Sequence, residues 1–448
     1  MPRIAQPGFR IRYTLIDESP ICRKELCGDI RPALRTFCGG SPAQTGASNF
    51  RFDNQAQKMF NYLTFNNRKK TEKLMTDSAP MPMAKARIAL SHLDGNIRAI
   101  RRWTGEHVRI MGVVKANAYG HGVHRVAGTL EQAGVGDFGV ANIQEAVALR
   151  TGQALKKPAS ILAFSSPLLP QIDAYLQHDI EMTVCSFDML RAAEEKAAAC
   201  GRKLTLQVKV DTGMGRLGLQ PAETMELLRT IDCSPHLILK GIYTHFAEGS
   251  KPDGYTAFQL DRFQELVMQY QSESGRTVCK HAASSGPILC RKDAWLDMVR
   301  PGILLYGYLP DPCMPSPVTV KPVMQVEAKV VFIKTVEQGT TVSYNRTWTA
   351  PGPRSIATIA AGYADGYPRA LSNRSTVVIN GKSFPQVGTV TMDQIMIDLG
   401  TDHDVKTGDN AILFGWEGPS ADDIAGSTGS ISYEVLCSVS GRVKRLFI

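Results

Sequence analysis

The sequence predicts an α/β protein: a (β/α)8 TIM-type barrel followed by a C-terminal, mainly antiparallel β domain. Two observations predict this fold. Between residues 83 and 313, eight short apolar runs alternate with helix-like segments, and a parallel barrel requires eight such βα units. Over residues 314–448 the runs are β-rich and separated by Gly, Pro and Asn-Gly turns, which indicates antiparallel strands. On pattern alone, an open doubly wound sheet is the alternative for the first domain.

The first 82 residues differ from the rest in charge and pattern. Of the net charge of +9, they contribute +6, with 13 basic and 7 acidic residues. They have neither a sustained helical or strand period nor the apolar core of a secretory signal, so we expect a poorly ordered basic extension. Because Met75, Met81 and Met83 stand just before the regular pattern, we expect the native product to start at one of them.

Composition excludes several classes of protein. The chain has 448 residues, with 43% hydrophobic and 21% charged residues, as in an average soluble protein rather than a fibrous or disordered one. No apolar run approaches the ~20 residues of a membrane span. Outside the extension the net charge is only +3, so nucleic acid is not an expected partner. Ten cysteines without zinc spacing predict no metal site and a reducing, cytoplasmic location.

Three segments show helix patterns in the predicted barrel. Ser91 with Asp94 three residues later predicts a helix N-terminus. Ser186–Cys200 is rich in Ala, Glu and Lys and is followed by Gly201, which marks both helix ends. Phe258–Tyr270 has apolar residues at largely helical intervals. The eight predicted strands are Ile110–Val114, Phe138–Val140, Ile161–Phe164, Met182–Cys185, Leu204–Val210, Leu237–Tyr243, Thr277–Cys279 and Val299–Tyr306.

The second domain is predicted from short β-rich runs and one strong turn signal. Asn380-Gly381 between two apolar runs predicts a two-residue hairpin. A helical pattern returns only near Ile431–Leu436. The predicted strands are Val323–Val331, Thr340–Ser343, Ile356–Ala361, Ser375–Ile379 and Ile395–Leu399.

Polar residues at the ends of the predicted barrel strands are candidates for an active site, because barrel enzymes work at that face. Lys115 ends the first apolar run. Desolvation of its cation would lower its pKa and make it a nucleophile for a carbonyl cofactor; a surface lysine is the alternative. Ser285-Gly286 and Gly302 follow the last two runs, where barrels commonly bind phosphate.

Three further side chains at this face could have either a functional or a structural role. Arg216 and Arg300 could hold a carboxylate or a ring acceptor, or form ordinary ion pairs at the surface. His245 could equally be a structural histidine. By themselves, these residues indicate a barrel enzyme with a lysine-bound carbonyl cofactor and a phosphate site.

Over roughly residues 84–448 the sequence resembles the alanine racemase family, which uses pyridoxal 5'-phosphate in a barrel with a C-terminal β domain. Eight blocks carry this resemblance, and they follow one another in the family's order. They are VVKANAYGHG at Val113–Gly122, DTGMGRLG at Asp211–Gly218, YTHFA at Tyr243–Ala247, MVRPGILLYG at Met298–Gly307, VSYNRTW at Val342–Trp348, GYADGYPR at Gly362–Arg369, TMDQ at Thr391–Gln394 and YEVLCSVSGRVKR at Tyr433–Arg445.

The resemblance implies a two-base mechanism in a homodimer. Lys115 would form the internal aldimine and act as the base on one face of the substrate Cα, and Tyr344 of the partner subunit would be the base on the other. Spacing alone would favour Tyr344 as a packing residue at a sheet edge, and the resemblance reverses this. Two bases on opposite faces are what racemisation needs. The implied function is interconversion of L- and D-alanine, which supplies D-alanine for peptidoglycan.

The resemblance also assigns the residues around the cofactor. Arg300 would face the pyridine nitrogen, which leaves the ring unprotonated and disfavours side reactions. His245 would lie beside the ring. Arg216 with Met392 would contact the substrate carboxylate, and Lys209 matches a lysine that the family can carry as a carbamate. The residues implied to hold the phosphate are Tyr119, Ser285, Gly302, Ile303 and Tyr433.

One residue departs from the family pattern. Ser284 stands where the family usually has Asn before the phosphate-binding serine, so the anchoring of that loop is in question.

Three other functions are alternatives to an alanine racemase. A broad-specificity or serine-preferring racemase of the same fold is the main alternative. A non-catalytic cofactor carrier would not need Tyr344 and Met392, and the VSYNRTW and TMDQ blocks favour a racemase over a pyridoxal-phosphate decarboxylase.

Overall fold

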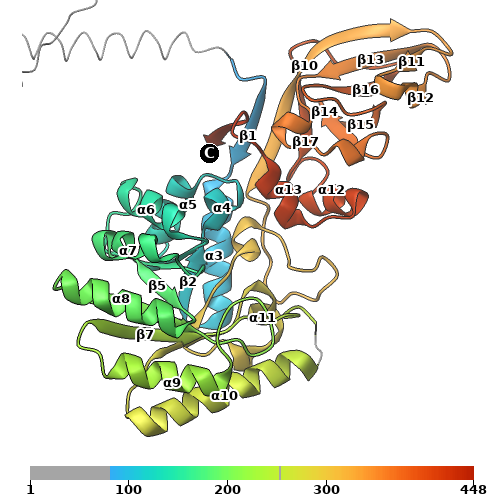
Figure 1. Ribbon diagram of the computed structural model, residues 1–448. Coiled ribbons are helices and arrows are strands. Elements are labelled where there is room, and N and C mark those ends of the chain that lie inside the picture. The colour runs from blue at the N-terminus through green and yellow to red at the C-terminus, as the bar shows by residue number, and fades with distance from the viewer. Residues whose placement is uncertain (1–80, 252–253) are drawn as a thin grey trace, which may run out of the picture. The chain divides into compact units, whose positions relative to one another are not determined.

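The structure is a computed structural model that describes residues 81–251 and 254–448. The predicted basic extension, residues 1–82, lies outside the described residues except for Met81 and Pro82. The described residues form two eight-stranded sheets and one two-stranded sheet (Figure 1). The first is parallel with helices between its strands, and the second is mainly antiparallel, which confirms the predicted fold class.

The strands of the first sheet lie in the order β8-β7-β6-β5-β4-β3-β2-β9. The two ends of this order meet, because Asp297 N donates to Lys280 O (3.1 Å) and Arg300 N donates to Ala283 O (2.9 Å). These bonds close the sheet into a barrel. Its strands are β2 Arg109–Val113, β3 Asp137–Val140, β4 Ser160–Ala163, β5 Glu181–Val184, β6 Leu204–Lys209, β7 Leu237–Tyr243, β8 Cys279–His281 and β9 Met298–Val299.

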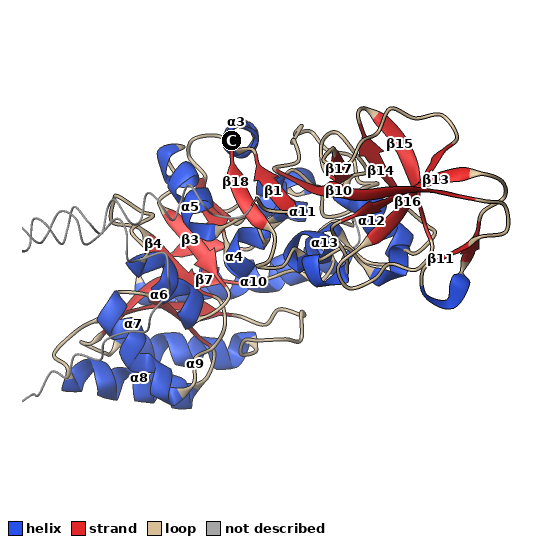
Figure 2. Ribbon diagram, turned by 90° about the horizontal axis from the view of Figure 1, so that it is seen from above, coloured by secondary structure: helices blue, strands red, loops and turns tan. Residues whose placement is uncertain are grey.

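Helices surround these strands on the outside (Figures 1 and 2). As predicted, Ser186 caps one of them, and its hydroxyl accepts from Met189 N. The predicted helix around Phe258–Tyr270 is also present. The helices of the barrel are α3 Leu90–Thr104, α4 Lys115–Tyr119, α5 Val123–Gln132, α6 Ile143–Thr151, α7 Ile172–His178, α8 Phe187–Ala199, α9 Pro221–Asp232, α10 Gly254–Ser274 and α11 Ser285–Cys290.

Three predicted boundaries in the barrel are wrong. Ser91 does not cap α3, because the helix already begins at Leu90, whose N–H bonds to Ile448 O (2.9 Å). The seventh strand is Cys279–His281 rather than Thr277–Cys279, since its partner in β7 is Gly241–Tyr243. The eighth strand stops at Val299 because Pro301 has no N–H for a ladder; Ile303–Tyr306 forms the 3₁₀ turn η3 instead.

In the second sheet the pairings β10–β13, β13–β16, β16–β15, β15–β14, β14–β17 and β17–β10 form a closed ring. The predicted hairpin is confirmed: Ile379 pairs with Lys382 across Asn380 and Gly381, which have φ of 51° and 77° as a type I′ turn requires. The strands are β10 Met324–Val336, β13 Arg354–Ile359, β14 Thr376–Ile379, β15 Lys382–Val387, β16 Ile395–Gly400 and β17 Asn410–Phe414; β11 Thr341–Val342 and β12 Trp348–Thr349 pair separately.

Two strands from opposite ends of the described chain extend this second sheet. β1 (Ala84–Ile88) pairs with β10, and β18 (Lys444–Phe447) pairs with β1 (Figure 2). β1 therefore lies within residues 83–313, the predicted barrel segment, yet it belongs to the second sheet. Sequence analysis missed it, although its alternation of buried Ala84, Ala86 and Ile88 with Lys85 and Arg87 is a strand signal.

The second domain also contains two helices. α13 (Ser432–Ser438) matches the predicted helical pattern, whereas α12 (Ala421–Thr428) was missed despite its capping box of Ser420 and Asp423. α13 packs against α4 of the barrel. Gly120, just after α4, has φ +80°, and a Cβ there would lie 2.3 Å from Leu436 O, so this close approach needs glycine. Among the described helices, none is long and apolar enough to cross a membrane.

Candidate functional site

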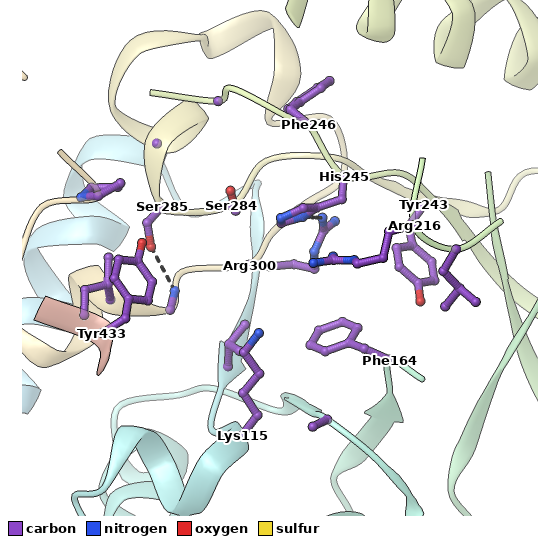
Figure 3. Close-up of a pocket in the computed structure, with 18 of the residues that line it drawn as sticks. Lys115, Phe164, Arg216, Tyr243, His245, Phe246, Ser284, Ser285, Arg300 and Tyr433 are labelled. Carbon is purple, nitrogen blue, oxygen red and sulfur yellow. Dashed lines mark hydrogen bonds between the residues drawn. The ribbon is translucent and has the colours of Figure 1, made fainter. Parts of the chain in front are cut away.

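A cavity of about 700 Å³ lies at the carboxyl ends of the barrel strands (Figure 3). Residues that follow β2, β4, β6, β7, β8 and β9 line it, and Tyr433 of α13 closes one side. The structure brings together ten of the twelve predicted site residues here, because strand ends of a closed barrel converge on its axis. These ten are Lys115, Tyr119, Lys209, Arg216, His245, Ser285, Arg300, Gly302, Ile303 and Tyr433.

The charged side chains that line the cavity among the described residues are all basic. Lys115, Lys209, Arg216 and Arg300 line it, and the described lining residues include neither aspartate nor glutamate. In a partly enclosed site, cations attract anions more strongly than in open water. The cavity therefore suits a ligand that carries more than one negative group.

Lys115 follows β2, and its amine points into the cavity (Figure 3). Within the described residues it has no hydrogen-bond or ion-pair partner. Although part of its surface is exposed through the cavity mouth, the protein around it lowers its pKa, first by desolvation and next through the charge of Arg216. A lysine whose pKa is lowered is more often neutral, and the neutral amine is the nucleophilic form.

A corner of neutral hydrogen-bonding groups lies opposite the cations. Ser285 Oγ accepts from Gly302 N (3.0 Å), so its own hydrogen is available to another acceptor. Burial raises the pKa of Tyr119 and raises that of Tyr433 to about 12, which keeps both as neutral O–H donors. A Cβ on Gly302 would lie 2.5 Å from Tyr119 Oη. Only glycine lets the backbone and this hydroxyl approach so closely.

Arg300 is 4% exposed and its guanidinium is fixed on several sides. Its Nη2 donates to Thr244 O (2.8 Å) and Ala282 O (2.9 Å), and its Nη1 donates to His281 Nδ1 (2.8 Å). Burial lowers the pKa of Arg300 to about 10, so it remains a cation at neutral pH. It also contacts His245 Nδ1 (3.4 Å), whose pKa falls to about 3 through burial and then through the charge of Arg300. His245 is therefore a neutral ring.

A chain of buried polar groups supports Arg300 from inside the barrel. Gln207 Nε2 donates to Glu181 Oε2 (2.5 Å), and Gln207 Oε1 contacts His281 Nε2 (2.6 Å). Because a carboxylate can only accept, the Gln207 amide nitrogen must face Glu181 and its oxygen must face His281. His281 therefore carries its hydrogen on Nε2 and offers Nδ1 to Arg300. The carboxylate also binds Lys240 and Ser160.

Sequence reasoning missed this chain of groups. Gln207 and Glu181 are buried polar residues in otherwise apolar strands, and such residues usually have a hydrogen-bonding role. That signal is present in the sequence. Their partners are not, since β7 lies between β6 and β8 and only the folded sheet brings the side chains of Gln207 and His281 together.

Lys209 and Arg216 come from the segment that begins in β6. Lys209 Nζ donates to Val210 O (2.7 Å), and burial together with the charge of Arg300 lowers its pKa to about 8. The Asp211 carboxylate accepts from Gly213 N, Met214 N and Gly215 N (2.9–3.2 Å), which shapes the loop that carries Arg216. Arg216 is exposed and has no hydrogen-bond partner in the described part of the chain, so its guanidinium is available to an anion.

Tyr344 and Met392 are the two predicted residues that the structure does not bring into this cavity. Both lie in the second domain, where they are 70% and 52% exposed. Tyr344 opens the 3₁₀ turn η4, next to Ser343 at φ +66° and Asn345 at φ +61°. Within one chain, therefore, the cavity has a lysine but not this tyrosine.

Ser284, the departure from the family pattern, lines the cavity before Ser285. Its side chain makes no hydrogen bond to any described residue. The loop is instead held by backbone bonds, including Ile288 N to Ser284 O (3.1 Å) and Arg300 N to Ala283 O (2.9 Å).

Comparison with known proteins gives one family over both domains. Residues 88–310 match the alanine racemase N-terminal domain and residues 323–447 the C-terminal domain. The chain is 58% identical over 366 residues to an alanine racemase of Chlorobaculum tepidum, covering 82% of this chain and 96% of that protein. It is 40% identical over 378 residues to one of Treponema denticola, covering 82% and 99%.

Solved structures agree with these matches. An alanine racemase of Clostridium difficile superimposes with a TM-score of 0.79 at 34% identity, over 83% of this chain and 97% of that one. The alanine racemase of Bartonella henselae with covalently bound pyridoxal phosphate gives 0.74 at 32% identity, over 82% and 100%.

Proposed function

The chain belongs to the alanine racemase family, and on this premise we propose that it interconverts L- and D-alanine with pyridoxal 5'-phosphate. The observation that carries the proposal is the cavity around Lys115, where an unpartnered amine of lowered pKa lies among three further basic side chains. The D-alanine so formed would supply peptidoglycan synthesis.

The residues of the cavity fit this cofactor and substrate. Its corner of neutral donors suits the phosphate of the cofactor, and the glycine cradle at Gly302 in that corner leaves room that a Cβ would fill. Its cations suit the carboxylate of the amino acid. When bound, pyridoxal phosphate withdraws electrons from the attached amino acid and so acidifies its α-hydrogen. The residues proposed to hold the phosphate are Tyr119, Ser285, Gly302, Ile303 and Tyr433.

The remaining residues would bind and orient the two molecules. Arg300 is proposed to face the pyridine nitrogen as a fixed cation, and His245 to lie beside the ring as a neutral imidazole. Arg216, which has no described partner, would bind the substrate carboxylate together with Met392. A carbamate on Lys209 would accept a hydrogen bond from Arg216; the lowered pKa of Lys209 supports this, because only a neutral amine reacts with carbon dioxide.

Racemisation requires a proton to leave one face of Cα and another to arrive at the opposite face. Lys115 Nζ would hold the proton on one face. Tyr344 Oη is proposed for the other face, and because Tyr344 is exposed and outside the cavity of its own chain, it would have to come from a second copy. The active enzyme would then be a homodimer with shared sites.

Racemase assays in both directions test the proposal. Lys115→Ala should abolish activity. Tyr344→Phe should slow racemisation in both directions, because the equilibrium constant between enantiomers is one. Exchange of the α-hydrogen with deuterium oxide should show that proton removal from L-alanine is slowed more than proton removal from D-alanine. If Tyr344→Phe changes both directions by less than twofold, the assignment of the second base is wrong. Turnover of serine, lysine and arginine in both configurations separates an alanine racemase from a broad-specificity or serine-preferring enzyme.

Co-expression of the Lys115→Ala and Tyr344→Phe variants tests the shared sites. A mixed dimer of Lys115→Ala and Tyr344→Phe chains contains one site with both native residues, so random pairing restores about a quarter of the native activity. If each site were built from one chain, the mixture would have no more activity than the average of the two variants alone.

A further inference from the structure

The geometry points to Glu145 as a positioning residue: we propose that its carboxylate holds the Lys115–Tyr119 turn in the shape that presents Lys115 and Tyr119 to the cofactor. It would do so by bridging the backbone N–H groups of Ala116 and Ala141. This inference rests on the proposed function only for the identity of the cofactor.

The turn needs support because its backbone is unusual. Ala116, Asn117, Ala118 and Tyr119 have φ between 51° and 55°, so α4 is a short left-handed turn. Residues with a Cβ pay free energy for this conformation, and consecutive left-handed residues are rare. Backbone strain of this kind persists only where surrounding contacts impose it, and it gathers at functional sites.

The turn satisfies its own backbone groups only in part. Gly120 N donates to Ala116 O (2.9 Å), and Gly122 N donates to Asn117 O (3.0 Å). The Ala116 N–H has no partner within the turn. It donates instead to Glu145 Oε1 (2.8 Å), which fixes the residue directly after Lys115.

Glu145 is placed for this contact by the start of α6. Asn142 caps the helix, and its side chain accepts from Glu145 N (3.0 Å). A glutamate at this third helical position ordinarily reaches back only to the cap. Here Oε2 accepts from Ala141 N (2.8 Å), and Oε1 is left for Ala116 of another loop. One carboxylate thus joins the loops that follow β2 and β3, at the end of the barrel where α4 and α6 lie (Figure 1).

The charge of Glu145 also acts on Lys115 itself. Desolvation and Arg216 lower the pKa of Lys115, and the charge of Glu145 opposes them. A residue that only capped α6 would affect the stability of that helix. Glu145 should instead control the order of the turn and the retention of the cofactor.

Glu145→Gln tests this role, because it keeps the shape of the side chain and removes its charge and its second acceptor. The control is Glu223→Gln, since Glu223 is likewise the third residue of a helix, accepts from Gln220 N (3.2 Å) and lies on α9. The measurements are hydrogen exchange by mass spectrometry on the full-length holoenzyme and the dissociation constant of pyridoxal phosphate.

Glu145→Gln should speed exchange of the amides of residues 115–120 about tenfold, as expected for the loss of a charged hydrogen bond, and weaken cofactor binding by a similar factor. Glu223→Gln should change neither. Adding Ala116→Gly should recover part of the loss, because glycine adopts the left-handed conformation without penalty.

The proposal is overturned if Glu145→Gln changes exchange only within Ile143–Thr151, or leaves both exchange at residues 115–120 and cofactor affinity within twofold of the native protein. Hydrogen exchange reports on the turn whatever reaction the enzyme catalyses. If the native protein shows no racemase activity while Glu145→Gln still speeds exchange at residues 115–120, the proposed function is refuted and the role of Glu145 remains supported.

Discussion

Gln207→Glu changes one atom at the centre of the buried chain that supports Arg300. Gln207 is 1% exposed, and its amide nitrogen lies 2.5 Å from Glu181 Oε2. After the substitution two carboxyl oxygens face each other in a buried site, so one of the two groups must take up a proton. The protonated form reproduces the native pattern, since its O–H donates to the neighbouring carboxylate and its other oxygen still accepts from His281.

The magnitude follows from the cost of that proton. A glutamate in the unfolded chain has a pKa of about 4.3, and holding it protonated costs about 1.4 kcal/mol for each pH unit above that value. The variant should therefore lose about 4 kcal/mol of stability at pH 7 and only about 1 kcal/mol at pH 5. Folding raises the pKa of this carboxyl group. The stability of the variant should therefore approach that of the native protein as the pH falls.

The assay is thermal or urea unfolding of the native protein and the variant at pH 5, 6 and 7. Gln269→Glu is the matched control, because Gln269 Nε2 also donates to a glutamate, Glu273 Oε1 (2.9 Å), but on the exposed surface of α10. Water screens that pair, so the control should differ from the native protein by less than about 0.5 kcal/mol at every pH. A loss of stability in Gln207→Glu that does not change between pH 5 and pH 7 would refute the hydrogen-bond directions assigned to the chain.

Three other predictions concern the cavity. Gly302→Ala places a Cβ 2.5 Å from Tyr119 Oη, whose ring packs on Tyr306 (4.7 Å between centroids), so the dissociation constant of pyridoxal phosphate, measured by equilibrium dialysis, should rise about tenfold or more. As a free amine, in buffer without carbon dioxide, Lys209 has its pKa lowered to about 8 by burial and then by the charge of Arg300. The unfolded chain then binds more protons above that pH, so native stability should rise between pH 8 and about pH 10. Lys209→Met should remove this rise. Carbon-13 NMR with labelled bicarbonate should give a carbamate signal that Lys209→Met also abolishes.

Much of the fold was predictable because each barrel strand is a short apolar run between helical patterns. Errors arose where tertiary contacts overrode local signals. The helix begins at Leu90 rather than after Ser91, because Leu90 N donates to the backbone oxygen of Ile448, a residue distant in sequence. β1 was missed because its partner strand, β10, begins more than 200 residues later, and a five-residue alternation is weak evidence by itself.

The candidate site was predictable to the extent that its residues stand at strand ends. Lys115 and Arg300 are in this class, and the fold alone makes them converge. Glu145 is different: its sequence pattern with Asn142 is that of a helix cap, and only the folded chain shows that its second oxygen reaches Ala116. For a side chain that acts by positioning another residue, the local sequence pattern does not indicate which residue it contacts.

Tyr344 lies exposed on a turn whose backbone is fixed. Its turn, with left-handed Ser343 and Asn345, is held by Thr389, whose Oγ1 donates to Tyr344 O (2.8 Å). The backbone is thus fixed while the phenol is 70% exposed. A partner surface for the phenol would explain both features, because strained backbone and exposed aromatic side chains are typical of binding sites. Under the proposed racemase function, the cavity beside Lys115 would need a base on the second face of the substrate. We therefore propose that Tyr344 of a second copy supplies this base.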